Sequence, residues 1–232
     1  MFVPASFDVS LNGSDETDAG YRVFPTVKWA ISFLVRSPLF LAVALAAGGA
    51  EVLLGEGTLL RWLVSATSVL LVTALAAITV EDAVTESTRT RVDRLLAALS
   101  ALPSLVKAIV TLAVVAFVGV LVPIVFIRLL GVFIAIVVFF YLIALFEVVF
   151  PAVVLDGSMS AGWDAFRRSK LVVFGLLVVF AAGRFPISYL SPTLADPVIA
   201  VALAGWSGLL TGISTLAYAR VYIAQRPAPK RP

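Results

Sequence analysis

The chain has 232 residues, of which 61% are hydrophobic and 13% are charged, and its mean hydropathy is +1.09. Because an average soluble domain carries about 25% charged residues, this composition excludes a water-soluble globular protein and indicates that much of the surface faces lipid. The chain has no Cys and no His, which excludes disulfides, thiol nucleophiles, imidazole bases and the usual zinc or copper ligands. The net charge of +3 comes from basic residues at segment ends rather than in one patch, so we expect no nucleic-acid partner. We also expect no cofactor.

The N-terminal segment is polar and acidic. Residues 1–20 carry acidic side chains, among them Asp8 and Asp15, but no Lys or Arg. A signal peptide needs a basic start and an apolar centre, and neither is present. We therefore expect residues 1–23 to form a disordered, acidic tail.

Long apolar runs dominate the rest of the chain. A membrane-spanning helix needs about 20 mostly apolar residues, and its backbone must be hydrogen-bonded internally because lipid offers no partners. The sequence therefore predicts an all-α, polytopic membrane domain over residues 24–224, followed by a basic tail at 225–232. We expect six transmembrane helices, at 38–55, 59–80, 104–127, 129–155, 171–190 and 197–223.

The basic residues predict the orientation of these spans. Of the 17 Lys and Arg residues, only Arg61, Arg128 and Arg184 fall on one side of the predicted membrane. All the others lie before the first span, between the second and third, between the fourth and fifth, after the sixth, or, for Lys107 and Arg220, within a span near its cytoplasmic end. Because cytoplasmic loops are enriched in Lys and Arg, we expect a multi-pass protein of the cell membrane with both termini in the cytoplasm.

Each odd-numbered span follows a short amphipathic stretch. These stretches run from Lys28 to Arg36, from Arg91 to Leu102 and from Met159 to Arg168, and in each one an apolar stripe lies opposite polar residues. They predict three short cytoplasmic interfacial helices, each followed by a helical hairpin, as a three-fold repeat. The alternative is that basic amphipathic stretches flank the spans by chance.

Glu147 is the clearest candidate for an intramembrane polar site. It lies in the fourth apolar run, about 12 Å of helix rise before its cytoplasmic end. An ionisable residue at that depth is costly and suggests a proton, ion or headgroup site. The alternatives are a structural ion pair, with Lys107 as the expected partner, or a carboxyl group kept neutral by burial.

Small residues in the sixth span predict close helix packing. Ala204, Gly208 and Gly212 recur at every fourth position and share one helix face. We expect this face to pack within the bundle or between protomers.

Two further charged groups have simpler interpretations. Glu81, Asp82 and Glu86 are expected to form a solvated loop together with nearby arginines. Arg184 is expected to reach the outer interface, with Asp196 as a candidate partner.

No catalytic motif is present in the sequence. There is no Gly-rich phosphate loop, no Ser in a nucleophile elbow and no set of acidic residues spaced for a metal.

One segment resembles a known family. The run Phe150-Pro151-Ala152-Val153-Val154-Leu155-Asp156-Gly157, followed by Arg167-Arg168-Ser169, resembles the cytoplasmic signature of six-helix prokaryotic membrane proteins. These proteins are similar to the membrane domain attached to some glycerophosphoryl diester phosphodiesterases. Many archaeal members are stand-alone, and the opening Lys28-Trp29 to Arg36-Ser37-Pro38-Leu39 fits the first interfacial helix of the group.

This resemblance implies the six-helix fold and an interfacial signature formed by Pro151, Asp156, Arg167, Arg168 and Ser169. It does not imply hydrolysis, because the soluble phosphodiesterase domain and its metal-binding residues have no counterpart in this chain.

Taken together, these features predict a non-enzymatic integral membrane protein that acts as a membrane scaffold or a lipid-interacting accessory protein. Its expected partners are membrane lipids, and a homo-oligomer or a second membrane protein is left open. The alternative is a small transporter or lipid translocator that uses Glu147 within the bundle. An enzyme acting on lipid is a third interpretation, which the absence of His and Cys disfavours.

Overall fold

A computed structural model describes residues 19–53, 59–190 and 196–226 of the chain. Nearly all of these residues are helical and none of them is in a strand, which confirms the predicted all-α class. The predicted tails lie mostly outside the described residues. The helices are α1 (Ala19–Arg36), α2 (Pro38–Leu53), α3 (Leu59–Val84), α4 (Arg91–Asp156), α5 (Met159–Leu190) and α6 (Pro197–Gln225).

The helices are long and apolar enough for a multi-pass membrane protein. Five helical segments could each cross a membrane, and the bent pair α1–α2 makes a sixth if it is counted as one span. By itself α2 has 16 residues, which is fewer than the roughly 20 that a spanning helix needs.

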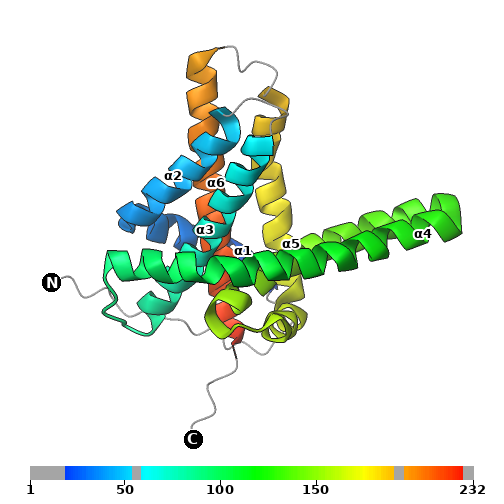
Figure 1. Cartoon of the computed structure of the whole chain (residues 1–232), viewed down its shortest axis with the longest axis horizontal. Coiled ribbons are helices and arrows are strands. Elements are labelled where there is room, and N and C mark those ends of the chain that lie inside the picture. Colours follow the sequence, from blue (N-terminus) through cyan, green and yellow to red (C-terminus); the bar gives the residue numbers. More distant parts are fainter. Residues whose placement is uncertain (1–18, 54–58, 191–195, 227–232) are drawn as a thin grey trace, which may run out of the picture.

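Helix α4 is a hairpin. Its 66 residues would extend about 100 Å if the helix were straight. A β-carbon on Gly119 would lie only 3.2 Å from Val138 Cγ1, although 19 residues of straight helix would separate them by about 28 Å. The helix therefore folds back on itself, and Figure 1 shows the two arms side by side. We call Arg91–Gly119 the first arm and Leu130–Asp156 the second arm.

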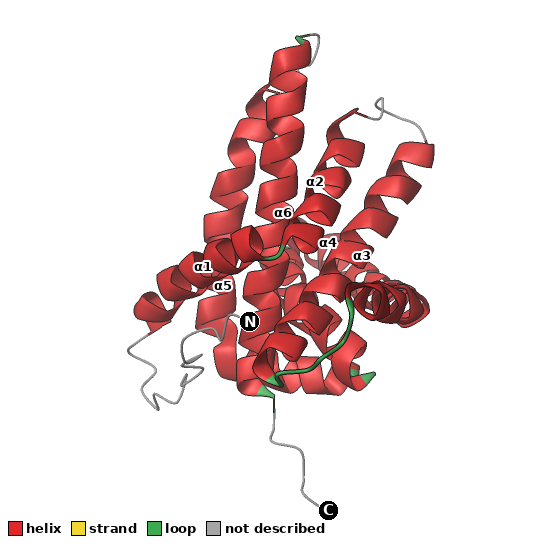
Figure 2. Ribbon diagram, turned by 90° about the vertical axis from the view of Figure 1, so that its left-hand side faces the viewer, coloured by secondary structure: helices red, strands yellow, loops and turns green. Residues whose placement is uncertain are grey.

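The hairpin runs across the other helices. Helices α2, α3, α5 and α6 stand roughly upright in Figure 1, and the α4 hairpin projects sideways from them; Figure 2 shows it nearly end-on. This arrangement differs from the expected set of six spans lying side by side. Apolar composition predicts that both arms avoid water, but it does not specify their angle to the other helices.

Only the first of the three expected interfacial helices is a separate element. Helix α1 ends at Arg36, and α2 leaves it at an angle of 102°. The Ser37-Pro38 sequence explains the break, because Pro lacks an N–H and disfavours helical geometry in the residue before it, yet fits the first turn of a new helix. The other two stretches are continuous with longer helices, as the first turns of α4 and α5.

Helices α2 and α6 pack with their backbones in direct contact. A β-carbon on Gly208 would lie 2.7 Å from Leu45 Cα and 2.7 Å from the carbonyl oxygen of Ala44. A β-carbon on Gly48 would clash with the backbone of Gly208 and with the carbonyl oxygen of Ala204. Small residues on both helices therefore permit this approach.

The hairpin arms, by contrast, expose large apolar side chains along most of their length. Val114, Phe117, Phe133, Val137 and Phe140 are each at least half exposed. Since such surfaces are unfavourable in water, they indicate lipid around the hairpin.

Candidate functional site

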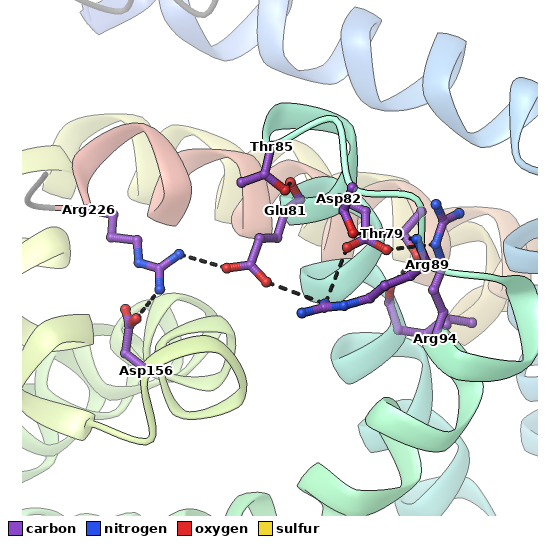
Figure 3. Close-up of polar contacts among 10 residues, drawn as sticks. Thr79, Glu81, Asp82, Thr85, Arg89, Arg94, Asp156 and Arg226 are labelled. Atoms are coloured by element: carbon purple, nitrogen blue, oxygen red, sulfur yellow. Dashed lines mark hydrogen bonds and ion pairs between the residues drawn. The ribbon is translucent and has the colours of Figure 1, made fainter. Parts of the chain in front are cut away.

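A network of charged side chains joins the ends of three helices (Figure 3). Its centre is Asp82, near the end of α3, whose side chain is only 1% exposed. Arg94 Nε donates to Asp82 Oδ2 at 2.7 Å, and an Arg89 nitrogen lies 3.2 Å from Asp82 Oδ1. The expectation of a solvated acidic loop is therefore wrong for Asp82, because the chain turns back after α3 and places two guanidinium groups over its carboxylate.

The second part of the network is built around Arg226, just beyond the end of α6. Arg226 donates to Glu81 Oε1 at 2.8 Å and also to Asp156 Oδ1, while the Tyr222 hydroxyl donates to Asp156 Oδ2. Burial lowers the pKa of Arg226, but the hydrogen bonds with Glu81 and Asp156 outweigh this effect and raise it above its ordinary value. The guanidinium therefore stays charged and ties α3, α4 and α6 together.

Local sequence positions both ends of α4 at this network. Thr90 and Asp93 form a capping box, in which the Thr90 side chain accepts from the Asp93 N–H and the Asp93 carboxylate accepts from the Thr90 N–H. At the other end, Gly157 has φ of 63°, and its N–H donates to Val153 O at 3.1 Å. This left-handed conformation favours glycine and ends the helix just after Asp156.

Basic side chains from several helices gather around the network. Arg167, Arg168 and Lys170, near the start of α5, are exposed, and Gly162 in the same first turns packs against the backbone of Val149 in α4. We call this part of the molecule the basic end and define it by Arg36, Arg89, Arg91, Arg94, Arg167, Arg168, Lys170 and Arg226.

A cavity of about 150 Å³ opens beside the network, at the bend between α1 and α2. Its charged lining residues are Arg36, Arg91 and Arg94, and Thr79 adds a hydroxyl group. The remaining lining residues are Ser37, Pro38, Leu39, Phe40 and Leu75.

The structure places Glu147 and Lys107 on different arms of the hairpin. Glu147 is half-buried in the second arm, whereas Lys107 is exposed on the first arm. No ion pair between them occurs in the described part of the chain. The field of Arg184 in α5 reaches Glu147, although the described residues contain no ion pair between the two. The sequence could not reveal this proximity, because it depends on how α4 and α5 pack.

The residues of the interfacial signature have different environments. Pro151 and Ser169 are buried, and the Ser169 hydroxyl donates to Ala165 O at 2.7 Å. Asp156 takes part in the network, while Arg167 and Arg168 remain exposed.

The predicted small-residue face lies against α2. A β-carbon on Gly212 would be 3.1 Å from Ala44 Cβ and 3.2 Å from Leu34 Cδ1. Ala204, Gly208 and Gly212 thus all meet α2 or the end of α1 within one chain.

Comparisons with protein-family models, curated proteins and solved structures find no match for this chain. The resemblance to the six-helix prokaryotic family therefore stays a prediction, and the residues alone support any functional conclusion. Across the described residues, no group of three or more acidic side chains lies close enough together to hold a metal ion.

Sequence reasoning missed Asp82, Tyr222 and Arg226 as members of one site. The signal available was weak: Glu81 and Asp82 are two acidic residues at the end of an apolar run, with several arginines following. Arg226 is 145 residues away from Glu81 along the chain, so only the fold reveals their contact.

Proposed function

We propose that this chain is a non-enzymatic integral membrane protein that binds anionic lipids through its basic end. The observation that carries the proposal is the clustering of exposed basic side chains beside strongly apolar helices. Such a juxtaposition places cations at the level of lipid headgroups when the apolar helices lie in the bilayer.

The charge at the basic end is only partly neutralised. Asp82, Glu81 and Asp156 accept ion pairs from Arg89, Arg94 and Arg226. Within the described residues, Arg36, Arg91, Arg167, Arg168 and Lys170 have no acidic partner. Each basic residue near an anionic membrane surface contributes about 1 kcal/mol of attraction, so these side chains together favour anionic lipids strongly.

The proposed topology follows from the same residues. Basic ends face the cytoplasm in most membrane proteins, so both termini are proposed to be cytoplasmic and the protein to lie in the cell membrane. The six-helix prokaryotic family, archaeal members included, is the proposed relative, on the strength of the Pro151-to-Asp156 and Arg167-to-Ser169 signature. A scaffold role with a protein partner or a second copy is compatible with this proposal.

Native mass spectrometry tests the proposal directly. The full chain is extracted into micelles containing equal amounts of phosphatidylcholine and phosphatidylglycerol, and the retained lipids are counted. We expect phosphatidylglycerol to be retained in excess, and the excess to fall in the Arg167→Gln/Arg168→Gln double variant and at high salt. Equal retention of the two lipids would refute the proposal.

A second candidate function rests on Glu147. Its carboxyl group and Arg184 both act electrostatically on the buried Tyr218 hydroxyl, which has no hydrogen-bond partner in the described residues. An acidic group and an unpaired buried hydroxyl among apolar helices favour a small transporter or lipid translocator. In that case, Glu147→Gln abolishes transport by reconstituted protein while the thermal unfolding temperature remains near that of the wild type.

A further inference from the structure

Three arginines line the cavity at the α1–α2 bend, and none of its lining residues in the described part of the chain is acidic. Arg36 comes from the end of α1, and Arg91 and Arg94 come from successive turns at the start of α4. Three guanidinium groups facing one small volume repel each other unless an anion is present. The lining therefore favours an anionic ligand.

The nearest acidic residue does not cancel this charge. Asp82 accepts a hydrogen bond from Arg94 Nε through Oδ2, and its Oδ1 forms an ion pair with Arg89. The Arg94 Nε is thus occupied, and its two terminal nitrogens have no hydrogen bond within the described residues. In the same part of the chain Arg36 and Arg91 have no acidic partner, so a net positive charge remains at the cavity.

The backbone adds hydrogen-bond donors to the same wall. Helix α2 begins at Pro38, and its first turn contributes Leu39 and Phe40 to the lining. The first regular helical bond is made by Leu41, whose N–H donates to Ser37 O at 2.9 Å. The N–H groups of Leu39 and Phe40 precede it and have no acceptor within the helix. Such a helix start adds a positive field to that of the arginines.

From this convergence we infer that the cavity binds a phosphate group. A volume of about 150 Å³ corresponds to roughly five water molecules in the liquid, which accommodates a tetrahedral oxyanion but not a large headgroup. Planar guanidinium groups bind phosphate oxygens in pairs. The phosphate belongs either to a lipid headgroup or to a small soluble molecule. If it belongs to a lipid, the inference rests on the proposed function; if it belongs to a soluble molecule, it does not.

The test uses the full chain in neutral detergent, with two probes titrated separately. One probe is inorganic phosphate, and the other is phosphatidic acid doped into the micelles. We expect each probe that binds to raise the thermal unfolding temperature of the wild type in a saturable manner. Arg36→Gln and Arg91→Gln are each expected to weaken binding about tenfold, since each removes one charge-assisted contact.

Matched controls separate the cavity from the surrounding surface. Lys28→Gln and Lys107→Gln also remove exposed positive charges, but from outside both the cavity and the basic end. They are expected to leave binding within about twofold of wild type, because they act only through screened, long-range fields. Arg94 is not substituted, because its loss would also remove a partner of Asp82. If Arg36→Gln fails to fold, Arg36→Lys replaces it as the cavity variant.

The outcomes assign the source of the phosphate. Saturable binding of phosphatidic acid far tighter than that of inorganic phosphate, lost in the cavity variants alone, establishes a lipid headgroup site. Comparable binding of both probes, again lost in the cavity variants alone, establishes a site for soluble phosphate.

Two further outcomes overturn the inference. If neither probe stabilises the wild type, the cavity is not a phosphate site. If the control variants weaken binding as much as the cavity variants, the attraction is spread over the surface, and the proposed function survives without this site. If inorganic phosphate stabilises the wild type but phosphatidylglycerol is not retained in excess, the cavity is a phosphate site and the proposed function is refuted.

Discussion

Helices α2 and α6 meet through glycines with no room for a further carbon atom, whereas the α4 hairpin exposes large apolar side chains on both arms. Both regions are apolar, so hydrophobicity does not distinguish them. What differs is the size of the side chains: small residues allow helices to approach until their backbones touch, and large ones keep neighbours apart and present a surface to lipid. The polar network at the base of the hairpin is where the two regions are joined.

The largest expected effect is at this junction. Asp82→Asn removes two charge-assisted contacts from a buried carboxylate but leaves Arg89 and Arg94 partly exposed to water, and we expect the free energy of unfolding to fall by about 3 kcal/mol. Unfolding in a denaturing detergent, followed by circular dichroism, measures the change. The matched control is Glu86→Gln, which removes an exposed carboxylate from the same turn. An equal loss in both variants would mean that the burial of Asp82 is unimportant.

The next effect is at the contact between α2 and α6. Gly208→Ala places a methyl group 2.7 Å from the backbone of α2, and because neither helix can yield without moving its neighbours, we expect a loss of about 1–3 kcal/mol. Gly205→Ala, three residues earlier on the same helix, meets nothing within 4 Å and is expected to be neutral or slightly stabilising. The same unfolding titration compares the two variants, and similar values for both would remove the distinction between the two regions.

A smaller effect is expected at Arg226, in the partly exposed part of the network. Arg226→Gln loses the hydrogen bonds with Glu81 and Asp156, but the Arg226 side chain is 30% exposed, so water compensates part of the loss. We expect about 1–2 kcal/mol. A double-mutant cycle with Glu81→Gln isolates the pairwise coupling, and strictly additive losses would contradict a direct interaction.

The smallest effect is expected on the hairpin itself. Phe133 is 65% exposed and Val137 is 68% exposed, so Phe133→Ala and Val137→Ala remove little packing. We expect changes within about 0.5 kcal/mol in detergent. A markedly larger loss in either variant would show that these side chains pack against protein, for example a second copy of the chain, rather than against lipid.

The sequence was sufficient to predict where the helices lie along the chain, but not how they are oriented relative to one another. Long apolar runs predicted the helical segments, and the Ser37-Pro38 pair marks the one sharp break between an amphipathic helix and an apolar one. The course of the α4 hairpin could not be predicted, because Gly119 and Val138 meet only through the turn between the arms. The amphipathic start of α5 merges with the helix that follows it, since no Gly or Pro lies at that junction, whereas α4 stays helical through Pro103 at the point where a break was expected.

The candidate site was only partly accessible to sequence reasoning. Asp156 was selected from its signature, but its partners Tyr222 and Arg226 belong to the end of a different helix. Asp82 resembled a solvated residue because neighbouring charges are usually exposed. Glu147 was recognisable as an acidic residue in an apolar run, whereas its electrostatic partner, Arg184, depends on the tertiary arrangement.

The capping geometry of α4 has a mechanical consequence. Arg94, near the start of the helix, and Asp156, at its last residue, are both held by the same network, so the hairpin is fixed at its base. A force applied far from the base acts on the network through a long lever arm. The tilt of some 60 residues is therefore set at the base, where the ionic contacts act together with the buried apolar residues of both arms, among them Leu105, Ala108 and Val148.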